Sequence, residues 1–334
     1  MSPVLSLSRA RVAPSAPRSA TETRLHVLYE NAAWLAPLED ALKAQGVPYV
    51  LHFVDGGTLD LGSTPPPGVY LNRMSPSSHT RGHQGGVQVV RDLLVWLEAH
   101  GRTVINGSRA FELELSKVRQ DLALRRVGLR TPRTLSVVGR SGLKAAARTL
   151  DVPFITKHNQ GGKGLGVKLF RDLDAFDAYV DGPDFIEDPG GVTLLQQYIT
   201  PASGRITRVE LVDGKFVYAM HSSTEDGFEL CPAAECSADD AFCPIGDSGR
   251  FTLARDFSPD DPLVGQYIAL MRAHGIRVAG IEFVEDANGD RYTYDINGTT
   301  NFNPDVEQEA GVRGMAFVAA LAARLLGVGV AQSA

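Results

Sequence analysis

The amino-acid sequence predicts a mixed α/β (α+β) protein made of three compact units. Its 334 residues are about twice the length of one typical domain. The folded part opens with a strand, a helix and a second strand, a pattern typical of a small parallel sheet. Later strands follow one another through short Gly-bearing turns, which favours antiparallel pairing. We therefore expect a parallel sheet near the N-terminus and antiparallel sheets after it.

The charge balance excludes several classes of partner. The chain has 33 Lys and Arg against 39 Asp and Glu, a net charge of -6, and so lacks a broad positive field for nucleic acid. The longest apolar stretch, Met315 to Leu326, contains Arg324 and is shorter than the about 20 residues that span a bilayer. We expect no nucleic-acid partner and no membrane partner. The last helix could serve the core or an interface, so a homo-oligomer is one option.

Three cysteines, Cys231, Cys236 and Cys243, are too few and odd in number for a disulfide framework. Free thiols suit a reducing compartment, so we expect a cytoplasmic protein. The spacing C-x4-C-x6-C is not a usual zinc pattern, and it leaves three alternatives: buried thiols, a metal site and a reactive Cys231.

Residues 1–23 are rich in Ser, Ala, Pro and Arg, carry one acid and have no continuous apolar segment. This composition predicts a disordered tail. The alternative is a mitochondrial-type transit peptide, which is also rich in Arg and Ser and poor in acids.

An N-terminal α/β domain is predicted over residues 24–115. Apolar spacing indicates a strand over 24–30, an amphipathic helix closed by Gly46, and a strand over 47–55. The first turn lacks G-x-G-x-x-G, so a dinucleotide site of the usual kind is not indicated. The unit is completed by a strand over 68–74, a Gly-rich loop, a helix over 88–100 and a strand over 104–106.

A central domain over residues 116–190 and a C-terminal domain over 191–330 follow. One helix over 110–127, ending at Gly128, carries the boundary between the first two domains. The central domain has strands over 134–139, 152–157 and 167–170, with helices over 143–150 and 172–180. The C-terminal domain is mostly antiparallel, with a two-residue turn at Asp213-Gly214. Its elements are strands over 193–199, 206–212, 215–221, 277–286 and 291–297, a helix over 261–274, and a closing helix that ends near Leu326.

A second hairpin brings two acids together. If Asn288 and Gly289 form a two-residue loop, Ala287 faces Asp290, Glu285 faces Tyr292, Phe283 faces Tyr294, and Glu282 faces Asp295. Alternation along the strand puts Asn297 on the same face as Asp295. A longer turn would shift the register by one residue and separate the acids.

Opposed carboxylates destabilise a sheet unless a cation or a proton lies between them. Glu282, Asp295 and Asn297 offer oxygen ligands on rigid strands, which suits Mg²⁺ or Mn²⁺ better than zinc. This hairpin is therefore a candidate metal site.

The segment HNQGGKGLG lies between two short predicted strands, directly after Lys157. Its glycines allow backbone N–H groups to approach phosphate oxygens, and Lys163 and Lys168 add positive charge. The segment is not a Walker A motif, because no Gly-Lys-Ser/Thr opens a helix. We expect either a phosphate-covering lid or an ordinary flexible hairpin.

Together these motifs resemble the ATP-grasp superfamily. A Lys at a strand end, a Gly-rich lid, the strand LLQQYI, and an acid followed by acid-x-Asn occur in that order between Lys117 and Asn303. The preceding segments LNRM, VIN and SKVRQDLALRRVGLRTPRT are similar to the RimK-type alpha-L-glutamate ligases, which are glutathione synthetase-like carboxylate-amine ligases. The resemblance implies an ATP-grasp fold with an N-terminal parallel-sheet domain, a central lid domain and a C-terminal antiparallel-sheet domain.

The resemblance also implies roles for individual residues. Lys117 and Lys157 match the lysines that reach the ATP phosphates, and Arg208 matches an arginine near the transferring phosphoryl group. The lid corresponds to Gly161, Gly162, Lys163, Gly164 and Gly166, the adenine hinge to Gln196, Gln197, Tyr198 and Ile199, and the magnesium ligands to Glu282, Asp295 and Asn297.

The adenosine and substrate contacts depart from the family. Gln197 stands where many relatives have Glu, and Ile206 stands where an acid would contact the ribose. FELCP replaces a basic Arg-Ser-Asn element, and DINGTTNFN, which contains Asn301 and Asn303, replaces E-x-N-A-S-P-G beside the acceptor site. In the first domain, the candidates for holding a substrate carboxylate are Arg73 and Arg81, with His79 and His83 near them, because Arg binds carboxylates bidentately. A solvated loop is the alternative.

The function implied is an ATP-dependent carboxylate-amine ligase that forms an amide or peptide bond through an acyl phosphate and releases ADP and phosphate. Its cofactors would be ATP and Mg²⁺ or Mn²⁺, and its partners a small-molecule or peptide carboxylate and an amine. The same first step with a thiol or hydroxyl acceptor is one alternative. Another is an ATP-binding regulatory protein with an ATP-grasp fold and no ligase turnover.

Overall fold

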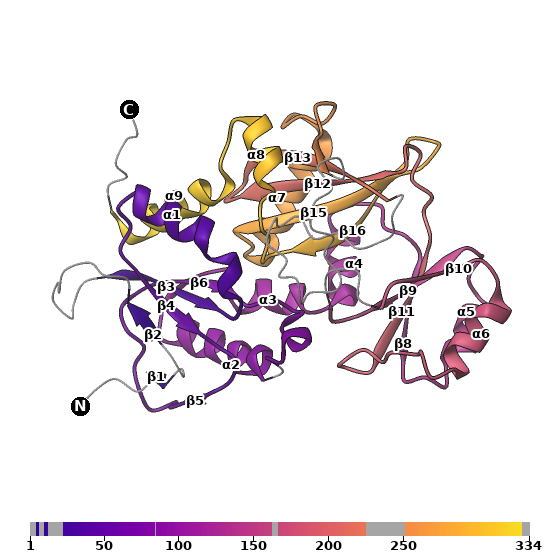
Figure 1. Ribbon diagram of the computed structural model, residues 1–334, viewed down its shortest axis with the longest axis horizontal. Helices are drawn as coiled ribbons and strands as arrows, with labels where there is room; N and C mark the ends of the chain where they lie inside the picture. The colour runs from indigo at the N-terminus through magenta and orange to yellow at the C-terminus, as the bar shows by residue number, and fades with distance from the viewer. Residues whose placement is uncertain are drawn as a thin grey trace.

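The computed structural model describes residues 5–6, 10–12, 23–83, 85–161, 166–224 and 251–328 (Figure 1). Two short strands, β1 (Leu5–Ser6) and β2 (Ala10–Val12), lie within the segment predicted as a disordered tail. They pair with β5 (Thr58–Leu59) and β4 (Tyr49–Phe53).

The N-terminal sheet has the strand order β2-β4-β3-β6-β7, and its strands other than β2 run parallel. Its central strands are rich in apolar residues because helices cover both faces. The predicted β-α-β start is confirmed. The remaining elements of this part are β3 (Arg24–Tyr29), η1 (Ala32–Trp34), α1 (Ala36–Ala44), β6 (Gly68–Arg73), η2 (Ser78–Arg81), α2 (Gly86–Ala99) and β7 (Thr103–Ile105).

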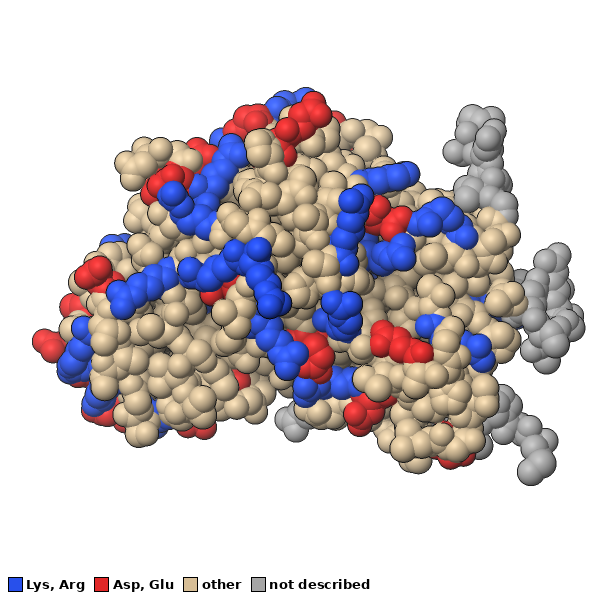
Figure 2. Space-filling model, turned by 180° about the vertical axis from the view of Figure 1, so that it is seen from behind, with Lys and Arg blue, Asp and Glu red and all other residues tan. Residues whose placement is uncertain are grey.

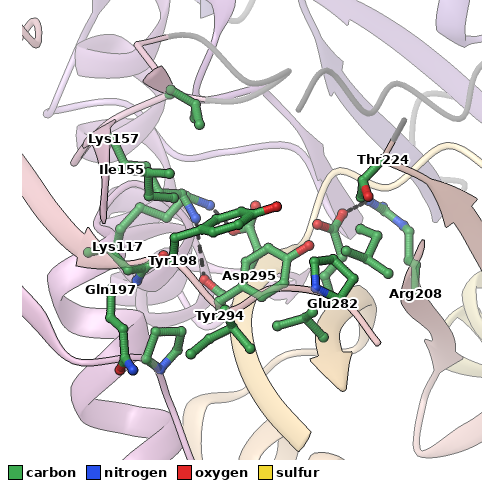
Figure 3. Close-up of a pocket in the computed structure, with 18 of the residues that line it drawn as sticks. Lys117, Ile155, Lys157, Gln197, Tyr198, Arg208, Thr224, Glu282, Tyr294 and Asp295 are labelled. Atoms are coloured by element: carbon green, nitrogen blue, oxygen red, sulfur yellow. Dashed lines mark hydrogen bonds and ion pairs between the residues drawn. The ribbon is translucent and has the colours of Figure 1, made fainter. Parts of the chain in front are cut away.

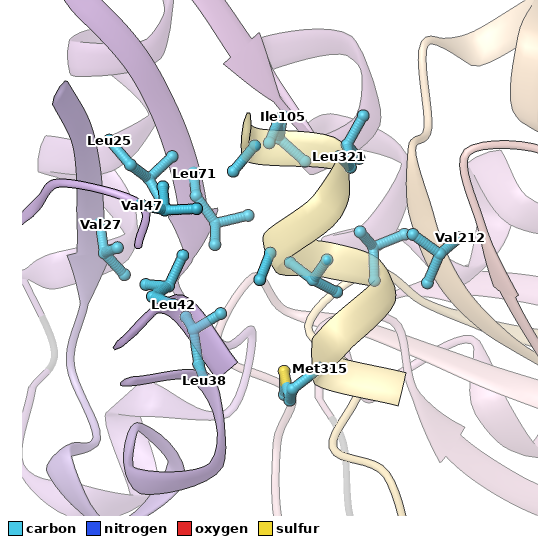
Figure 4. Close-up of a cluster of buried hydrophobic side chains, with 14 of the residues drawn as sticks. Leu25, Val27, Leu38, Leu42, Val47, Leu71, Ile105, Val212, Met315 and Leu321 are labelled. Carbon is cyan, nitrogen blue, oxygen red and sulfur yellow. The ribbon is translucent and has the colours of Figure 1, made fainter. Parts of the chain in front are cut away.

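The last helix, α9 (Gly314–Leu326), packs beside α1 on one face of the N-terminal sheet (Figures 1 and 4). Met315 and Leu321 of α9 belong to the same buried cluster as Leu25 and Leu71 of the sheet. Val212 of the C-terminal sheet joins this cluster, so α9 contacts both the N-terminal and the C-terminal sheet. The apolar last helix is therefore a core helix.

The prediction of one helix over residues 110–127 is wrong, because the chain forms α3 (Ser108–Glu114) and α4 (Lys117–Arg126). Ser116 interrupts the helix with an extended backbone, and its Oγ accepts a hydrogen bond from Arg119 N at 3.3 Å. Asn159 fixes the same point, since its backbone O accepts from Lys117 N at 3.0 Å and its Oδ1 from Val118 N at 3.1 Å. The break places Lys117 in the first turn of a new helix.

The central sheet has the order β10-β9-β11-β8 and is antiparallel throughout. Two helices cover one face, where Phe176 meets Phe154 and Phe170 edge to face with ring centroids 5.1 and 5.0 Å apart. The predicted elements are present: β8 (Thr134–Val138), α5 (Leu143–Ala147), β9 (Phe154–His158), β10 (Lys168–Phe170), α6 (Leu173–Asp181) and β11 (Val192–Gln197).

The C-terminal sheet has the order β14-β13-β12-β15-β16, all antiparallel. The two-residue turn at Asp213-Gly214 is confirmed: both residues have positive φ, 51° and 73°, and Val212 faces Lys215. The elements are β12 (Arg205–Val212), β13 (Lys215–Ser223), β14 (Phe251–Leu253), α7 (Pro262–His274), β15 (Val278–Glu285) and β16 (Arg291–Asn297). A helix that the sequence did not predict, α8 (Pro304–Ala310), precedes α9.

The second hairpin, between β15 and β16, has a different register near its loop from the one predicted. The loop is one residue longer than expected, since Asp286 N donates to Asp290 O and Gly289 adopts a φ of +80°. The predicted pairs Ala287–Asp290, Glu285–Tyr292 and Phe283–Tyr294 are therefore wrong, and Glu285 faces Arg291. A bulge at Tyr294 restores the expected register, so Glu282 does face Asp295.

Candidate active site

A cavity lies between the central sheet and the C-terminal sheet (Figure 3). It encloses ≈ 1020 Å³ including its open mouth, which is enough for a ligand of nucleotide size. The predicted site residues that line it are Lys117, Lys157, Gly161, Gln196, Gln197, Tyr198, Ile199, Arg208, Glu282, Asp295 and Asn297. The structure thus brings together residues from β9, β11, α4, β12, β15 and β16.

The three candidate metal ligands lie at one end of the cavity. Glu282 on β15 faces Asp295 on β16, and Asn297 Nδ2 lies 3.4 Å from Glu282 Oε1. Among the described residues, no group of three or more His, Cys, Asp and Glu could hold a metal ion. A third ligand beside the two carboxylates would have to be the amide oxygen of Asn297. Two carboxylates and one amide oxygen are hard donors, which fit Mg²⁺.

Two lysines line the cavity from the central part of the chain (Figure 3). Lys117, which is buried, forms an ion pair with Asp295, and Lys157 Nζ lies 3.5 Å from Tyr294 O. Burial, together with the positive charge of Lys157, holds the pKa of Lys117 well below its usual value. Burial also lowers the pKa of Lys157 to about 8. Two cations crowded into a partly desolvated space indicate a binding site for an anion.

Arg208 enters from β12 and is held on three sides. Its Nε donates to Glu210 Oε1 at 2.6 Å, its Nη1 to Glu282 Oε1 at 2.7 Å, and its Nη2 to Thr300 Oγ1 at 2.7 Å. Burial alone would lower the pKa of Arg208, but the carboxylates of Glu210 and Glu282 raise it, so the guanidinium stays charged. The arrangement fixes a cation beside the candidate metal ligands.

Part of the cavity wall is apolar. Ile199, Ile206 and Val284 form a buried cluster, against which Tyr292 and Tyr294 pack. Ile206, where the resemblance would place a ribose-binding acid, thus belongs to this apolar wall. A slot of this kind suits a flat aromatic ring.

The segment predicted as the adenine hinge borders this slot. Gln197 N donates to Arg133 O at 2.8 Å, and Tyr198 N donates to Pro153 O at 3.2 Å. Since these two amides hold the hinge itself in place, recognition of a base would fall to other groups of the segment.

Several lining residues were not predicted from the sequence. Val284 could have been found, because it lies two residues from Glu282 on the same strand face. Tyr294 could not, because only the bulge lets it line the cavity together with its neighbour Asp295. Burial, and then the nearby Glu282 carboxylate, raise the pKa of Tyr294 well above its usual value, so its hydroxyl stays protonated beside that carboxylate.

The four predicted substrate residues do not line the cavity. Arg73 Nη1 donates to Thr300 O at 2.7 Å and its Nη2 to Asn301 Oδ1 at 2.5 Å, which joins the N-terminal sheet to the segment after β16. Arg81 pairs with the buried Glu30 at 2.5 Å, and Asn303 Oδ1 accepts from the first amides of α8. A substrate role for Arg73, Arg81, Asn301 and Asn303 stays a prediction.

The lid is described only at its two ends. Gly161 lines the cavity, and Gly166 has a φ of +73° and lies beside the ring of His158. A Cβ at Gly166 would lie 2.3 Å from that ring, so both the backbone and the contact require glycine. Gly162, Lys163 and Gly164 lie outside the described residues, as do Cys231, Cys236 and Cys243.

The comparisons with known proteins agree with this arrangement. Residues 116–229 match the family model described as the RimK-like ATP-grasp domain. The protein has an ATP-grasp fold. A RimK domain ATP-grasp protein from Sphaerobacter thermophilus is 18% identical, with a TM-score of 0.64 over 90% of this chain and 99% of that chain. The ATP-grasp ligase PsnB, complexed with a minimal precursor, Mg and ADP, is 15% identical, with a TM-score of 0.62 over 93% and 100%.

In sequence, the chain is also similar to a D-alanine–D-alanine ligase of Hydrogenovibrio crunogenus. The two are 28% identical over 166 residues, which make up 49% of this chain and 50% of that ligase. The match therefore spans half the length of the relative.

No helix among the described residues is long and apolar enough to cross a membrane.

Proposed function

We propose that this ATP-grasp protein is an ATP-dependent carboxylate-amine ligase that works through an acyl phosphate. One observation carries the proposal: a single cavity joins an apolar slot to a charged end where Lys117, Lys157 and Arg208 meet Glu282 and Asp295. The slot suits adenine, and the charged end suits a triphosphate with its divalent cation. Both the base and the phosphates of ATP would therefore meet suitable side chains in one cavity.

The side chains of this chain have separate tasks in the proposed reaction. Lys117 and Lys157 bind the phosphates, and Arg208 lies ready to stabilise charge on the transferring phosphoryl group. A substrate carboxylate oxygen attacks the γ-phosphorus and releases ADP. An amine then attacks the acyl carbon and releases phosphate, leaving an amide. Mg²⁺ or Mn²⁺, held by Glu282, Asp295 and Asn297, would screen the charge of the β- and γ-phosphates.

Closure of the Gly161 to Gly166 lid would protect the acyl phosphate from water. The reacting carboxylate and amine belong to an amino acid, a peptide or another small acid. The relatives support this range, since one is named for ligation of D-alanine and another is complexed with a precursor. We place the reaction in the cytoplasm, with assembly into a homo-oligomer as a further option.

The test is product analysis by chromatography. The protein is incubated with ATP, Mg²⁺ and a pool of amino acids, dipeptides and small carboxylic acids. ADP and phosphate that depend on the pool support the ligase, and dividing the pool then identifies the two substrates. The variant Glu282→Ala, which removes a proposed metal ligand, is assayed beside the wild type and should lose this turnover.

AMP and pyrophosphate as products would refute attack at the γ-phosphorus. ATP binding without turnover in any part of the pool would favour the regulatory alternative. A product that forms only with a thiol or an alcohol would keep the first step and change the acceptor.

A further inference from the structure

A second hollow lies outside the nucleotide cavity, on the surface formed by α2, α3, α4 and the end of α7. It encloses ≈ 1560 Å³ and is open to solvent, so it is a groove and not a closed pocket. We call it the α4 groove. Four arginines line it: Arg109, Arg119, Arg125 and Arg126.

The α4 groove is positively charged although the protein as a whole carries a net charge of -6. Figure 2 shows Lys and Arg side chains gathered in a band across the middle of one face of the molecule. Within the groove, Arg125 is neutralised by Asp121 at 2.7 Å, and Glu112 is neutralised by Arg91 at 2.5 Å.

Three arginines of the groove keep their charge uncompensated or nearly so. Arg119 lies 3.5 Å from Glu112, which already has a closer partner in Arg91. Within the described part of the chain, the side chain of Arg109 donates to a single acceptor, the backbone carbonyl Ala273 O, at 2.6 Å. Arg126 has no ion-pair partner among the described residues. Together these three arginines give the groove an excess of positive over negative charge among the described residues.

The pKa of His274, at the end of α7, is affected by the same positive charges. Burial lowers its pKa, and the positive charges of Arg109 and Arg126 lower it further. The ring is therefore neutral at pH 7 and adds no negative or positive charge to the groove.

Two exposed apolar side chains lie among the charged residues of the groove. Leu122 is 61% exposed and Val95 57% exposed, and both rank among the few large apolar side chains that the described surface exposes. Exposed apolar side chains beside a polar rim are typical of an interaction site. The groove thus presents arginine guanidinium groups next to exposed apolar side chains.

We propose that the α4 groove binds an acidic polypeptide segment of a partner protein, with apolar side chains between its carboxylates. Arginine binds carboxylates bidentately, so Arg109, Arg119 and Arg126 would each take one acidic side chain. Leu122 and Val95 would take the apolar side chains.

Other occupants fit less well. A nucleic acid would bind through its phosphates and would leave the apolar contacts of Leu122 and Val95 unused. A second copy docked symmetrically through the same groove would set arginines against arginines.

The experiment uses the full-length protein and a fluorescein-labelled twelve-residue peptide of alternating Glu and Leu, read by fluorescence anisotropy. The wild type should bind this peptide, and added salt should weaken the binding. The double variant Arg119→Glu/Arg126→Glu should weaken it by at least about tenfold, since each reversal replaces an attraction with a repulsion. Leu122→Asn should weaken it by a smaller factor of about three.

The matched control is Arg171→Glu/Lys215→Glu, which makes the same change of net charge at two exposed positions outside the groove. This control should bind the peptide within about twofold of the wild type, and circular dichroism should show both double variants folded. The proposal is overturned if the wild type does not bind, if both double variants lose binding equally, or if a DNA duplex binds more tightly than the peptide.

Discussion

Glu210 offers a sharp test of how the site holds its arginine. Its side chain is fully buried, and its Oε1 lies 2.6 Å from Arg208 Nε. Glu210→Gln keeps the shape and an acceptor but removes the charge. Arg208 then keeps one carboxylate partner, Glu282 at 2.7 Å, in place of two.

Removing one partner of a buried ion pair costs about 3–5 kcal/mol, because the remaining charge is left desolvated and uncompensated. Glu282 still neutralises part of the guanidinium charge, so we expect the lower end, about 3 kcal/mol of unfolding free energy. The control is Glu309→Gln. Glu309 pairs with Arg255 at 2.7 Å, but their side chains are 42% and 71% exposed. A pair of that exposure is worth less than about 1 kcal/mol.

Urea unfolding, followed by circular dichroism and tryptophan fluorescence, measures both variants. The midpoint shift multiplied by the slope of the transition gives the loss of stability. Two pairs of nearly equal length should thus differ severalfold because only one is buried. Equal, small losses for the two variants would show that Arg208 does not depend on Glu210, and the electrostatic reasoning for the site would fail.

Three further predictions concern other parts of the molecule. Lys157→Met should weaken ATP binding, measured by calorimetry, by at least about tenfold, because a cation at the phosphates is lost, whereas Lys168→Met, outside the cavity, should bind as the wild type does. His26 and His52 meet at 2.9 Å, and burial lowers both pKa values to about 4. The unfolded rings take up protons below their ordinary pKa of about 6.5, so thermal stability should fall between pH 6.5 and 4, and His52→Gln should flatten that slope; an unchanged slope would contradict the burial argument. Asp188→Ala should raise the KM for ATP more than it lowers kcat, since Asp188 accepts from Gln160 N at 2.7 Å at the start of the lid, and an unchanged KM would refute this role.

Much of the fold could be predicted because apolar periodicity and glycine turns carry it. The β-α-β start and the hairpin at Asp213-Gly214 follow from local sequence alone. The break between α3 and α4 at Ser116 was harder to predict. Asn159, which is far from Ser116 in the sequence, stabilises this break by accepting a hydrogen bond from Val118 N. The packing of α9 on the N-terminal sheet could not be predicted either, because it depends on contacts between segments far apart in the chain.

The candidate site shows how a correct prediction can rest on an incomplete argument. Glu282 faces Asp295 as the two-residue turn predicted, but the loop is longer, and a bulge at Tyr294 restores the register. The side chain of Asp286 favours the longer loop, because its Oδ1 accepts from Asn288 N at 2.9 Å. Turn sequence alone does not reveal such a compensating bulge.

The acyl-phosphate route is the central claim, and oxygen transfer tests it most directly. With the acid and amine that the pool identifies, the acid is labelled with ¹⁸O in its carboxylate. Attack on the γ-phosphorus places one carboxylate oxygen on phosphorus, and the later attack by the amine leaves that oxygen there. Mass spectrometry should therefore find one ¹⁸O in the released phosphate for each amide formed. Label in AMP, or phosphate without label, would contradict the account.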